Sequence, residues 1–181
     1  RELNGIDVKN DVNNFRLFLH LVDAISNNHF RNIGFNDKIE KILIFYTEEF
    51  GKFLTNSEIY NIFRDNKLVL YFLFENKILN FDHYIVNGIL KSKKKKYPNY
   101  FINEIKPFIN EKVFKEIELE NQNNQIDMDP EIFEKNRRKG ENESKLCQLV
   151  RNDDIDEFIT YVSLNDISPQ TEINNSTFET N

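Results

Sequence analysis

Histidine and cysteine supply many of the metal ligands and nucleophiles of proteins, and this chain has three histidines and one cysteine. His20, His29 and His83 are far apart along the chain and match no metal-ligand spacing. Cys147 lies within an apolar helical pattern, which favours a small core residue over a nucleophile. The G-x-S-x-G, Gly-rich phosphate-loop and H-E-x-x-H motifs do not occur. We therefore expect no enzymatic activity, metal, cofactor or small-molecule ligand.

Acidic residues gather at one point near the C-terminal end of the chain, at Asp153, Asp154, Asp156 and Glu157. Their spacing does not match an EF-hand, which needs a glycine at its sharp turn and a terminal glutamate. Acidic side chains are also favourable at the N-terminus of a helix. We expect a solvated helix corner here rather than a cation site.

The most conspicuous charged feature is a run of five lysines. They are Lys91, Lys93, Lys94, Lys95 and Lys96. Such a run can contact phosphate or direct nuclear import, so a nucleic-acid-associated helical domain is the alternative function. A solvated loop is favoured, because the net charge is −6 and cations also suit a helix C-terminus. A smaller basic cluster, Arg137, Arg138 and Lys139, is expected to lie in a linker.

Composition indicates a soluble globular protein. The 181 residues are 39% apolar and 30% charged, which suits one domain or slightly more. A single cysteine excludes an internal disulfide and favours the reducing cytoplasm, with the nucleus as the alternative. No apolar run approaches the roughly 18 residues of a membrane span, so we expect no membrane association. Because the chain begins with Arg1, we interpret it as a segment of a longer protein.

Apolar residues recur at helical spacing along most of the chain, and no segment alternates as a half-buried strand would. The expected helices cover residues 11–28, 36–53, two within 57–79, 81–90, 99–108, 111–119, 130–136 and two within 144–163. The helix-start signals are Asp11, the capping box Thr55 and Glu58, Asp129 with Pro130, and Ser144. Ala24 is the only alanine, so these helices must depend mainly on tertiary packing.

Residues 57–79 are the stretch around which the chain is organised. They predict two short helices joined by a polar corner at residues 64–66. The second, residues 68–74, is apolar on every side, and a helix with no polar face must be covered on all sides. Periodicity alone also permits a buried strand, but the chain offers no second strand to pair with it. We therefore expect Tyr71, Phe72 and Leu73 to be shielded from solvent.

The same helix pair recurs 87 positions later. At this shift Arg64 aligns with Arg151, and Phe63 aligns with Val150. Leu68 and Phe72 align with Ile155 and Ile159. Repeated helix pairs with short polar corners are typical of a solenoid, in which each unit covers the apolar face of its neighbour.

Three stretches carry a resemblance to a known family. They read TNSEIYNIFRDNK (55–67), KYPNYFINEIKPFINEKVF (96–114), and KGENESKLCQLVRNDDIDEFITYV (139–162) followed by TEINNSTFETN (171–181). They resemble a large family of protist proteins in which a domain of unknown function runs into ankyrin repeats. The resemblance implies a helical interaction scaffold without enzymatic activity. The threonine-proline-leucine-histidine signature of a standard ankyrin repeat does not occur, so standard β-hairpins are not expected.

Together these features predict an all-α fold of stacked helix pairs, a short ankyrin-like α-solenoid without clear β-hairpins. The expected domains are a helical N-terminal domain (1–119), a linker with a short helix near 130–136 (120–143), and the truncated start of an ankyrin-like region (144–181). The expected function is a protein–protein interaction scaffold whose partners are other proteins, with nucleic acid the less favoured partner. The candidate partner-binding residues are Arg64, Arg151, Lys93, Lys94, Lys95 and Lys96. For the two arginines, hydrogen bonds to neighbouring carbonyls are the alternative role.

Overall fold

Helices make up all the regular structure in the described part of the chain. The computed structural model describes residues 8–29, 33–92, 96–123, 126, 129–140, 144–168, 170 and 177–178, and no strand occurs among them. The expected all-α class is thereby confirmed. The α-helices are α1 Val12–His29, α2 Ile33–Phe45, α3 Thr47–Phe53, α4 Asn56–Phe63, α5 Lys67–Glu75, α6 His83–Lys91, α7 Tyr97–Tyr100, α8 Ile102–Ile105, α9 Glu111–Asn123, α10 Pro130–Lys139, α11 Lys145–Arg151 and α12 Ile155–Leu164. A 3-10 helix, η2, covers Lys106–Phe108.

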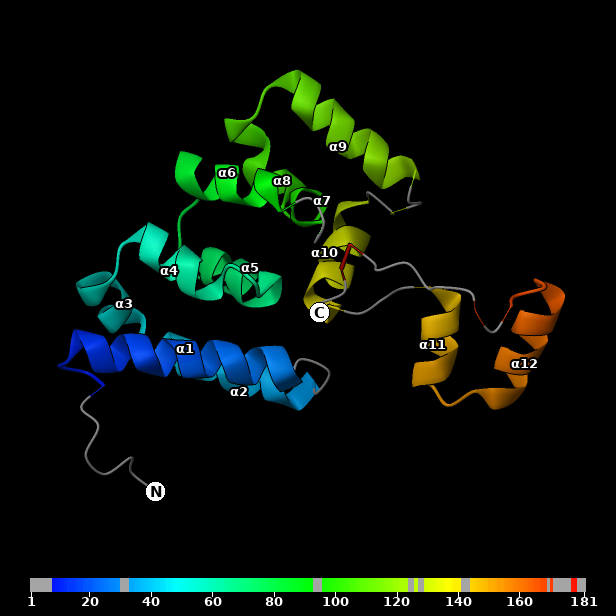
Figure 1. Ribbon diagram of the computed structural model, residues 1–181, viewed down its shortest axis with the longest axis horizontal. Helices are drawn as coiled ribbons and strands as arrows, with labels where there is room; N and C mark the ends of the chain where they lie inside the picture. The colour runs from blue at the N-terminus through cyan, green and yellow to red at the C-terminus, as the bar shows by residue number, and fades with distance from the viewer. Residues whose placement is uncertain are drawn as a thin grey trace.

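The helices are stacked in layers (Figure 1). The pair α1 and α2 lies against α4 and α5, which are followed by α6, α7 and α8, with α9 outermost. Helix α10 stands beside α5 and α7 and closes one side of this body. Helices α11 and α12 pack on each other and stand apart from the other helices in Figure 1. The stacked helices therefore form one body, and the α11–α12 pair projects from it.

Local sequence signals start the helices where they were expected. The Asp11 carboxylate accepts hydrogen bonds from two backbone N–H groups at the start of α1. Thr55 and Glu58 form the reciprocal capping box, in which the Thr55 N–H donates to Glu58 Oε2 at 2.8 Å. The side chains of Asp129 and Ser144 cap α10 and α11. These four signals are confirmed.

Two expected helices are interrupted. The helix expected over 36–53 begins earlier, at Ile33, and is divided by Tyr46 into α2 and α3. Residues 97–108 form α7, α8 and η2 in place of one helix. Pro107 lacks an N–H group, so the regular α-helical ladder cannot continue through it, and the chain tightens into a 3-10 turn.

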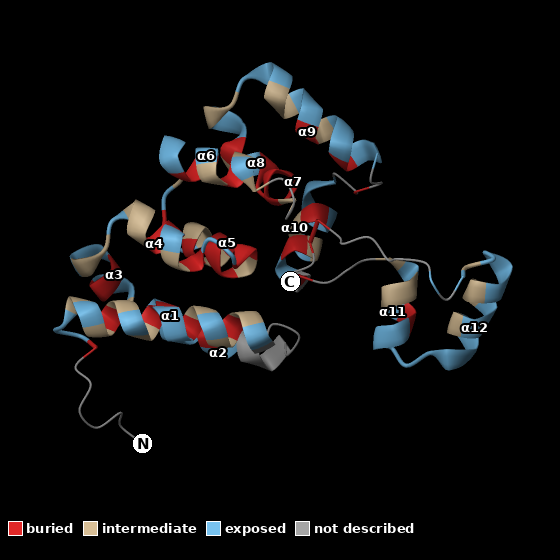
Figure 2. Cartoon of the chain, in the orientation of Figure 1, coloured by how far each residue is buried: buried red, intermediate tan, exposed pale blue. Residues whose placement is uncertain are grey.

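Helix α5 is shielded along its whole length. Each of its residues is buried or half-buried, and Leu73 is fully covered. Tyr71 is 5% exposed, and Phe72 packs against the core as a partly buried side chain. The prediction that Tyr71, Phe72 and Leu73 are shielded is confirmed. In Figure 2, by contrast, α11 and α12 are mainly pale blue, and α12 has no buried residue.

The expected linker, residues 120–143, differs from what the structure shows. Residues 120–123 complete α9, and the helix near 130–136 extends over Pro130–Lys139 as α10. Phe133 and Arg137 on α10 are buried, so this helix belongs to the stacked body. The stretches on either side of residues 130–136 are polar and favoured a linker, while Phe133 and Arg137 lie four residues apart and so share one face of α10.

The helix-pair repeat is present as two helix–corner–helix units. Helices α4 and α5 form the first, and α11 and α12 form the second. The Asn66 side chain caps α5 by accepting from Val69 N–H, and Asp154 caps α12 by accepting from Glu157 N–H. Both units are two helices joined by a three-residue corner, and they differ in how far neighbouring helices cover them.

Burial of α5 predicts a large difference between two leucine truncations. Leu73→Ala, at 0% exposure, is expected to lower the free energy of unfolding by about 2–5 kcal/mol, because it leaves a cavity in the core. The matched control is Leu17→Ala on α1, where the leucine is 68% exposed. This substitution should change the free energy of unfolding by no more than about 0.5 kcal/mol. Urea unfolding followed by circular dichroism measures both. Equal losses would contradict the buried position of α5.

Candidate functional site

The residues proposed from sequence as partner anchors are not brought together. Arg64 is exposed at the α4–α5 corner, where its Nε lies 3.8 Å from Asp65 Oδ2. Arg151 is exposed at the end of α11, on the projecting pair. Figure 1 shows the two helix pairs well separated. Arg64 follows the last residue of α4, whereas Arg151 is itself the last residue of α11, and the two arginines do not form one surface.

The lysine run is only partly described. Lys91 is exposed at the end of α6, and Lys96 is half-buried with a left-handed backbone (φ 52°) just before α7. Lys93, Lys94 and Lys95 lie outside the described residues. The structure therefore adds no observation in favour of a phosphate-binding surface here.

Histidine and cysteine remain dispersed in the fold. His20 and His83 are exposed on α1 and α6, and Cys147 is half-buried on α11. Among the residues that the structure describes, no group of three His, Cys, Asp or Glu side chains could hold a metal ion. None of the described helices has both the length and the apolar character needed to cross a membrane.

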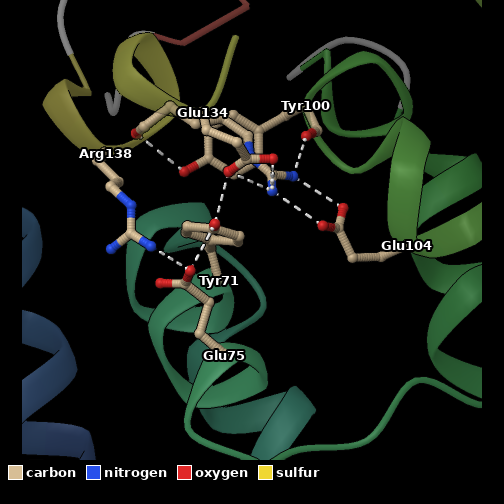
Figure 3. Close-up of polar contacts among 7 residues, drawn as sticks. Tyr71, Glu75, Tyr100, Glu104, Glu134 and Arg138 are labelled. Atoms are coloured by element: carbon tan, nitrogen blue, oxygen red, sulfur yellow. Dashed lines mark hydrogen bonds and ion pairs between the residues drawn. The ribbon is translucent and has the colours of Figure 1, made fainter. Parts of the chain in front are cut away.

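The most developed polar arrangement is centred on Arg137, in a cluster that we call the Arg137 junction (Figure 3). Its members are Tyr71 and Glu75 on α5, Tyr100 on α7, Glu104 on α8, and Glu134, Arg137 and Arg138 on α10. The Arg137 side chain is only 1% exposed. The basic cluster was expected to lie in a linker, whereas Arg137 is buried on α10.

The Arg137 guanidinium is held by two carboxylates. It donates to both oxygens of Glu104, from Nη1 at 2.8 Å and Nη2 at 2.9 Å. Nη2 also donates to Glu134 Oε1 at 2.8 Å. Burial alone would lower the pKa of Arg137, but hydrogen bonds to Glu104 and Glu134 and charge attraction to Glu104 raise it above its ordinary value. A bidentate pair of this kind fixes both the position and the orientation of the side chain.

Main-chain groups complete the link between α10 and α7. Arg137 Nη1 donates to the Tyr100 carbonyl at 2.9 Å, and Tyr100 Oη donates to the Arg137 carbonyl at 3.2 Å. The guanidinium also lies over the Tyr71 ring, with Cζ 3.9 Å from the ring centroid. Arg137 thus contacts α5, α7 and α8 from a single position on α10.

The Tyr71 hydroxyl lies between two carboxylates of different helices. Its oxygen is 2.7 Å from Glu75 Oε1 and 2.6 Å from Glu134 Oε2. A hydroxyl carries one hydrogen, so it donates to one of them at a time. Burial raises the pKa of Tyr71, and hydrogen bonds to Glu134 and Glu75 raise it further. Arg138, at the exposed edge, forms an ion pair with Glu75. The junction is a set of ion pairs and hydrogen bonds that connects α10 to α5, α7 and α8.

A sequence signal for Arg137 existed. Phe133 lies four residues before it, so the two side chains share one face of α10, and Glu134 lies at a spacing suited to an ion pair. Phe133 and the spacing to Glu134 therefore placed Arg137 on an apolar, ion-pairing face of α10, without showing that it is buried. Glu104, which also pairs with Arg137, lies 33 residues earlier in the sequence, and no local pattern identifies it.

A second polar feature lies where α1 meets the α4–α5 corner. Asn66 Nδ2 donates to Ser26 Oγ at 3.0 Å, while Asp23 Oδ1 and Tyr97 Oη are buried without a hydrogen-bond partner in the described residues. Burial raises the pKa of Asp23, and the nearby Asp65 carboxylate raises it further. An ionised Asp23 is therefore unfavourable in the folded protein.

A small cleft lies between α1, α2 and α5. It is lined by Ser26, Ile39, Glu40, Leu43, Leu68, Val69 and Phe72. Its volume of about 10 Å³ is enough for about one water molecule. Burial raises the pKa of Glu40 at its edge, and Asp37 raises it further. The cleft is too small for a substrate or cofactor.

Comparison with family models, curated proteins and solved structures finds no match to this chain. Functional inference therefore depends on the residues and geometry described above.

The Arg137 junction predicts opposite outcomes for two adjacent arginines. Arg137→Leu should lower the free energy of unfolding by about 3–5 kcal/mol, because the buried Glu104 carboxylate loses its cation. Arg138→Leu should cost only about 0–1 kcal/mol, since that side chain is 62% exposed. Urea unfolding measures both. Adding Glu104→Leu to Arg137→Leu should recover part of the lost free energy of unfolding, because it removes the unpaired carboxylate. Failure to recover any of it would contradict this explanation.

The raised pKa of Asp23 predicts a stabilising substitution. Asp23→Asn should raise the melting temperature at pH 7, because the folded state then no longer buries this charge near Asp65. Lowering the pH through the raised pKa protonates Asp23 in the folded protein, so the gain should shrink and be lost below the ordinary value of 3.8. Thermal melts from pH 7 to about pH 3 test this, with Glu116→Gln at an exposed position of α9 as the control. A gain independent of pH would contradict the assignment.

Proposed function

We propose that the protein is a non-enzymatic helical scaffold that binds other proteins through the projecting α11–α12 pair. The observation that carries this proposal is an exposed apolar strip on α12, made of Ile155 and Ile159, which lie four residues apart and are 63% and 57% exposed. Val150 on α11 and Leu164 at the end of α12 are also exposed, at 65% and 80%. Exposed apolar residues that cluster on one element are typical of protein interaction sites.

The residues of the first helix pair that align with this strip in sequence indicate what fits it. Ile155 and Ile159 align with Leu68 and Phe72 of α5 at the shift of 87. Leu68 and Phe72 are half-buried and line the same small cleft as Ile39 and Leu43 of α2. An amphipathic helix with apolar residues four apart therefore covers this face in the first copy. We propose a helix of the same kind as the partner of α12.

Charge around the strip adds a second requirement. Asp153, Asp154, Asp156 and Glu157 border it at the α11–α12 corner, and all four are exposed. Helix α2 itself carries exposed Lys38 and Lys41 beside its apolar face. The partner helix is therefore expected to carry basic residues next to its apolar positions, since complementary charge sets orientation and speeds association.

The resemblance to ankyrin-containing proteins supports the same proposal. In a solenoid, a helix pair exposes an apolar face until the next pair covers it. The layered packing of the first helices and the open face of α11–α12 suit an ankyrin-like stack. Under this proposal the chain is an interaction scaffold, and its role is recognition rather than catalysis.

Binding should depend on the α12 strip. We expect the amount of protein that the immobilised full chain retains from a lysate to fall at least roughly tenfold in the double variant Ile155→Asp plus Ile159→Asp. These substitutions place two negative charges at the centre of the proposed interface. The matched control is Leu17→Asp plus Leu21→Asp, a second exposed apolar pair four residues apart on α1. Quantitative mass spectrometry compares the three samples.

Circular dichroism should show both variants folded. Retention that is unchanged by the α12 substitutions, or lost equally with the α1 substitutions, would contradict the proposed binding face.

A further inference from the structure

A short C-terminal segment is seated on the stacked body, far from the helices that precede it in sequence. Thr177 and Phe178 are each 1% exposed. In Figure 1 this red segment lies against α10. Residues of α5 and α10 make the contacts to these two residues that are described below.

The first contact recognises the main chain. Lys67 Nζ, at the start of α5, donates to the Thr177 carbonyl at 2.8 Å, across 110 residues of sequence. Lys67 is itself 5% exposed, and its ammonium lies 5.3 Å from the centroid of the Tyr100 ring. A hydrogen bond to a carbonyl is available from any residue type, so this contact fixes position without selecting a side chain.

The second contact recognises an aromatic ring. Phe178 packs edge-on against Phe133 of α10, with ring centroids 5.2 Å apart and planes at 74°. Phe133 is 1% exposed and lies beside the Arg137 guanidinium, whose Cζ is 5.5 Å from its ring centroid. The Arg137 junction thereby holds the wall of the aromatic pocket in place.

One feature of the bound segment is poorly matched to the surface. The Thr177 hydroxyl is buried, and it has no hydrogen-bond partner among the residues that the structure describes. A buried hydroxyl without a partner is unfavourable relative to its hydrated state. The surface therefore suits an apolar residue at this position better than the threonine that occupies it.

We propose that Lys67, Tyr100 and Phe133 form a peptide-binding site, which Thr177 and Phe178 occupy in the same chain. The site takes a peptide segment in which a phenylalanine follows a small β-branched residue. Lys67 holds the carbonyl between them, and Phe133 holds the ring. This site is separate from the α12 strip, so either assignment can fail without the other.

Reactivity of the Lys67 amine reports on occupancy of the site. In the full chain, acylation of Lys67 should be slow because the seated segment covers it. Phe178→Ala should raise its rate roughly tenfold or more, since the buried ring supplies most of the apolar contact. Thr177→Val should lower the rate, because valine keeps the shape and removes the unpaired hydroxyl. Peptide mass spectrometry measures Lys67 against exposed Lys112 in the same molecule.

A synthetic peptide of residues 170–181 tests recognition directly. Added in millimolar excess, it should restore protection of Lys67 in the Phe178→Ala chain, and the same peptide with Phe178→Ala should not. Equal Lys67 rates in the parent chain and both variants would overturn the proposal, as would failure of the parent peptide to protect. Protection that rises with protein concentration, together with a dimer in sedimentation, would place the segment in a second copy and overturn occupation within one chain.

Discussion

The need to cover α5 on all sides organises the structure. A helix with no polar face is stable in water only when other elements surround it. Helix α2 covers the side that carries Leu68 and Phe72, and α4 packs against it through the preceding corner. Helix α10 and the segment 177–178 reach it from the remaining direction. Elements from most of the sequence thus contact the nine residues of α5.

Two buried polar side chains on this otherwise mainly apolar helix select the elements that cover it. Lys67 and Tyr71 are both buried, and a buried polar group needs a hydrogen-bond partner. Tyr71 finds carboxylates at its hydroxyl and the Arg137 guanidinium on its ring, which brings α10 to α5. Lys67 finds the Thr177 carbonyl, which brings the C-terminal segment. Apolar burial supplies the driving force, while these polar contacts select the partner and its orientation.

The sequence predicted features that depend on neighbouring residues. The caps at Thr55 and Asp129, the corner before α5 and the burial of Leu73 all follow from patterns within about ten residues. The Arg137 junction could not be predicted in this way, since a charged residue in a polar stretch is ordinarily exposed. Its burial depends on Glu104, and no local pattern connects residues 33 positions apart. Sequence reasoning therefore found the helices and missed the contact that holds α10 among them.

Comparison of the two helix pairs distinguishes what local sequence determines from what tertiary packing determines. Both form two helices with a capped corner, although one is enclosed and the other projects from the body. Phe63 is fully buried, whereas its counterpart Val150 is 65% exposed. Capping and the pairing of two helices are thus enough to set the local shape, and neighbouring helices determine burial. The apolar residues of the second pair keep the pattern of an enclosed unit, and an apolar strip of that kind is stabilised when another helix covers it. For this reason we propose a helix as the partner of α12.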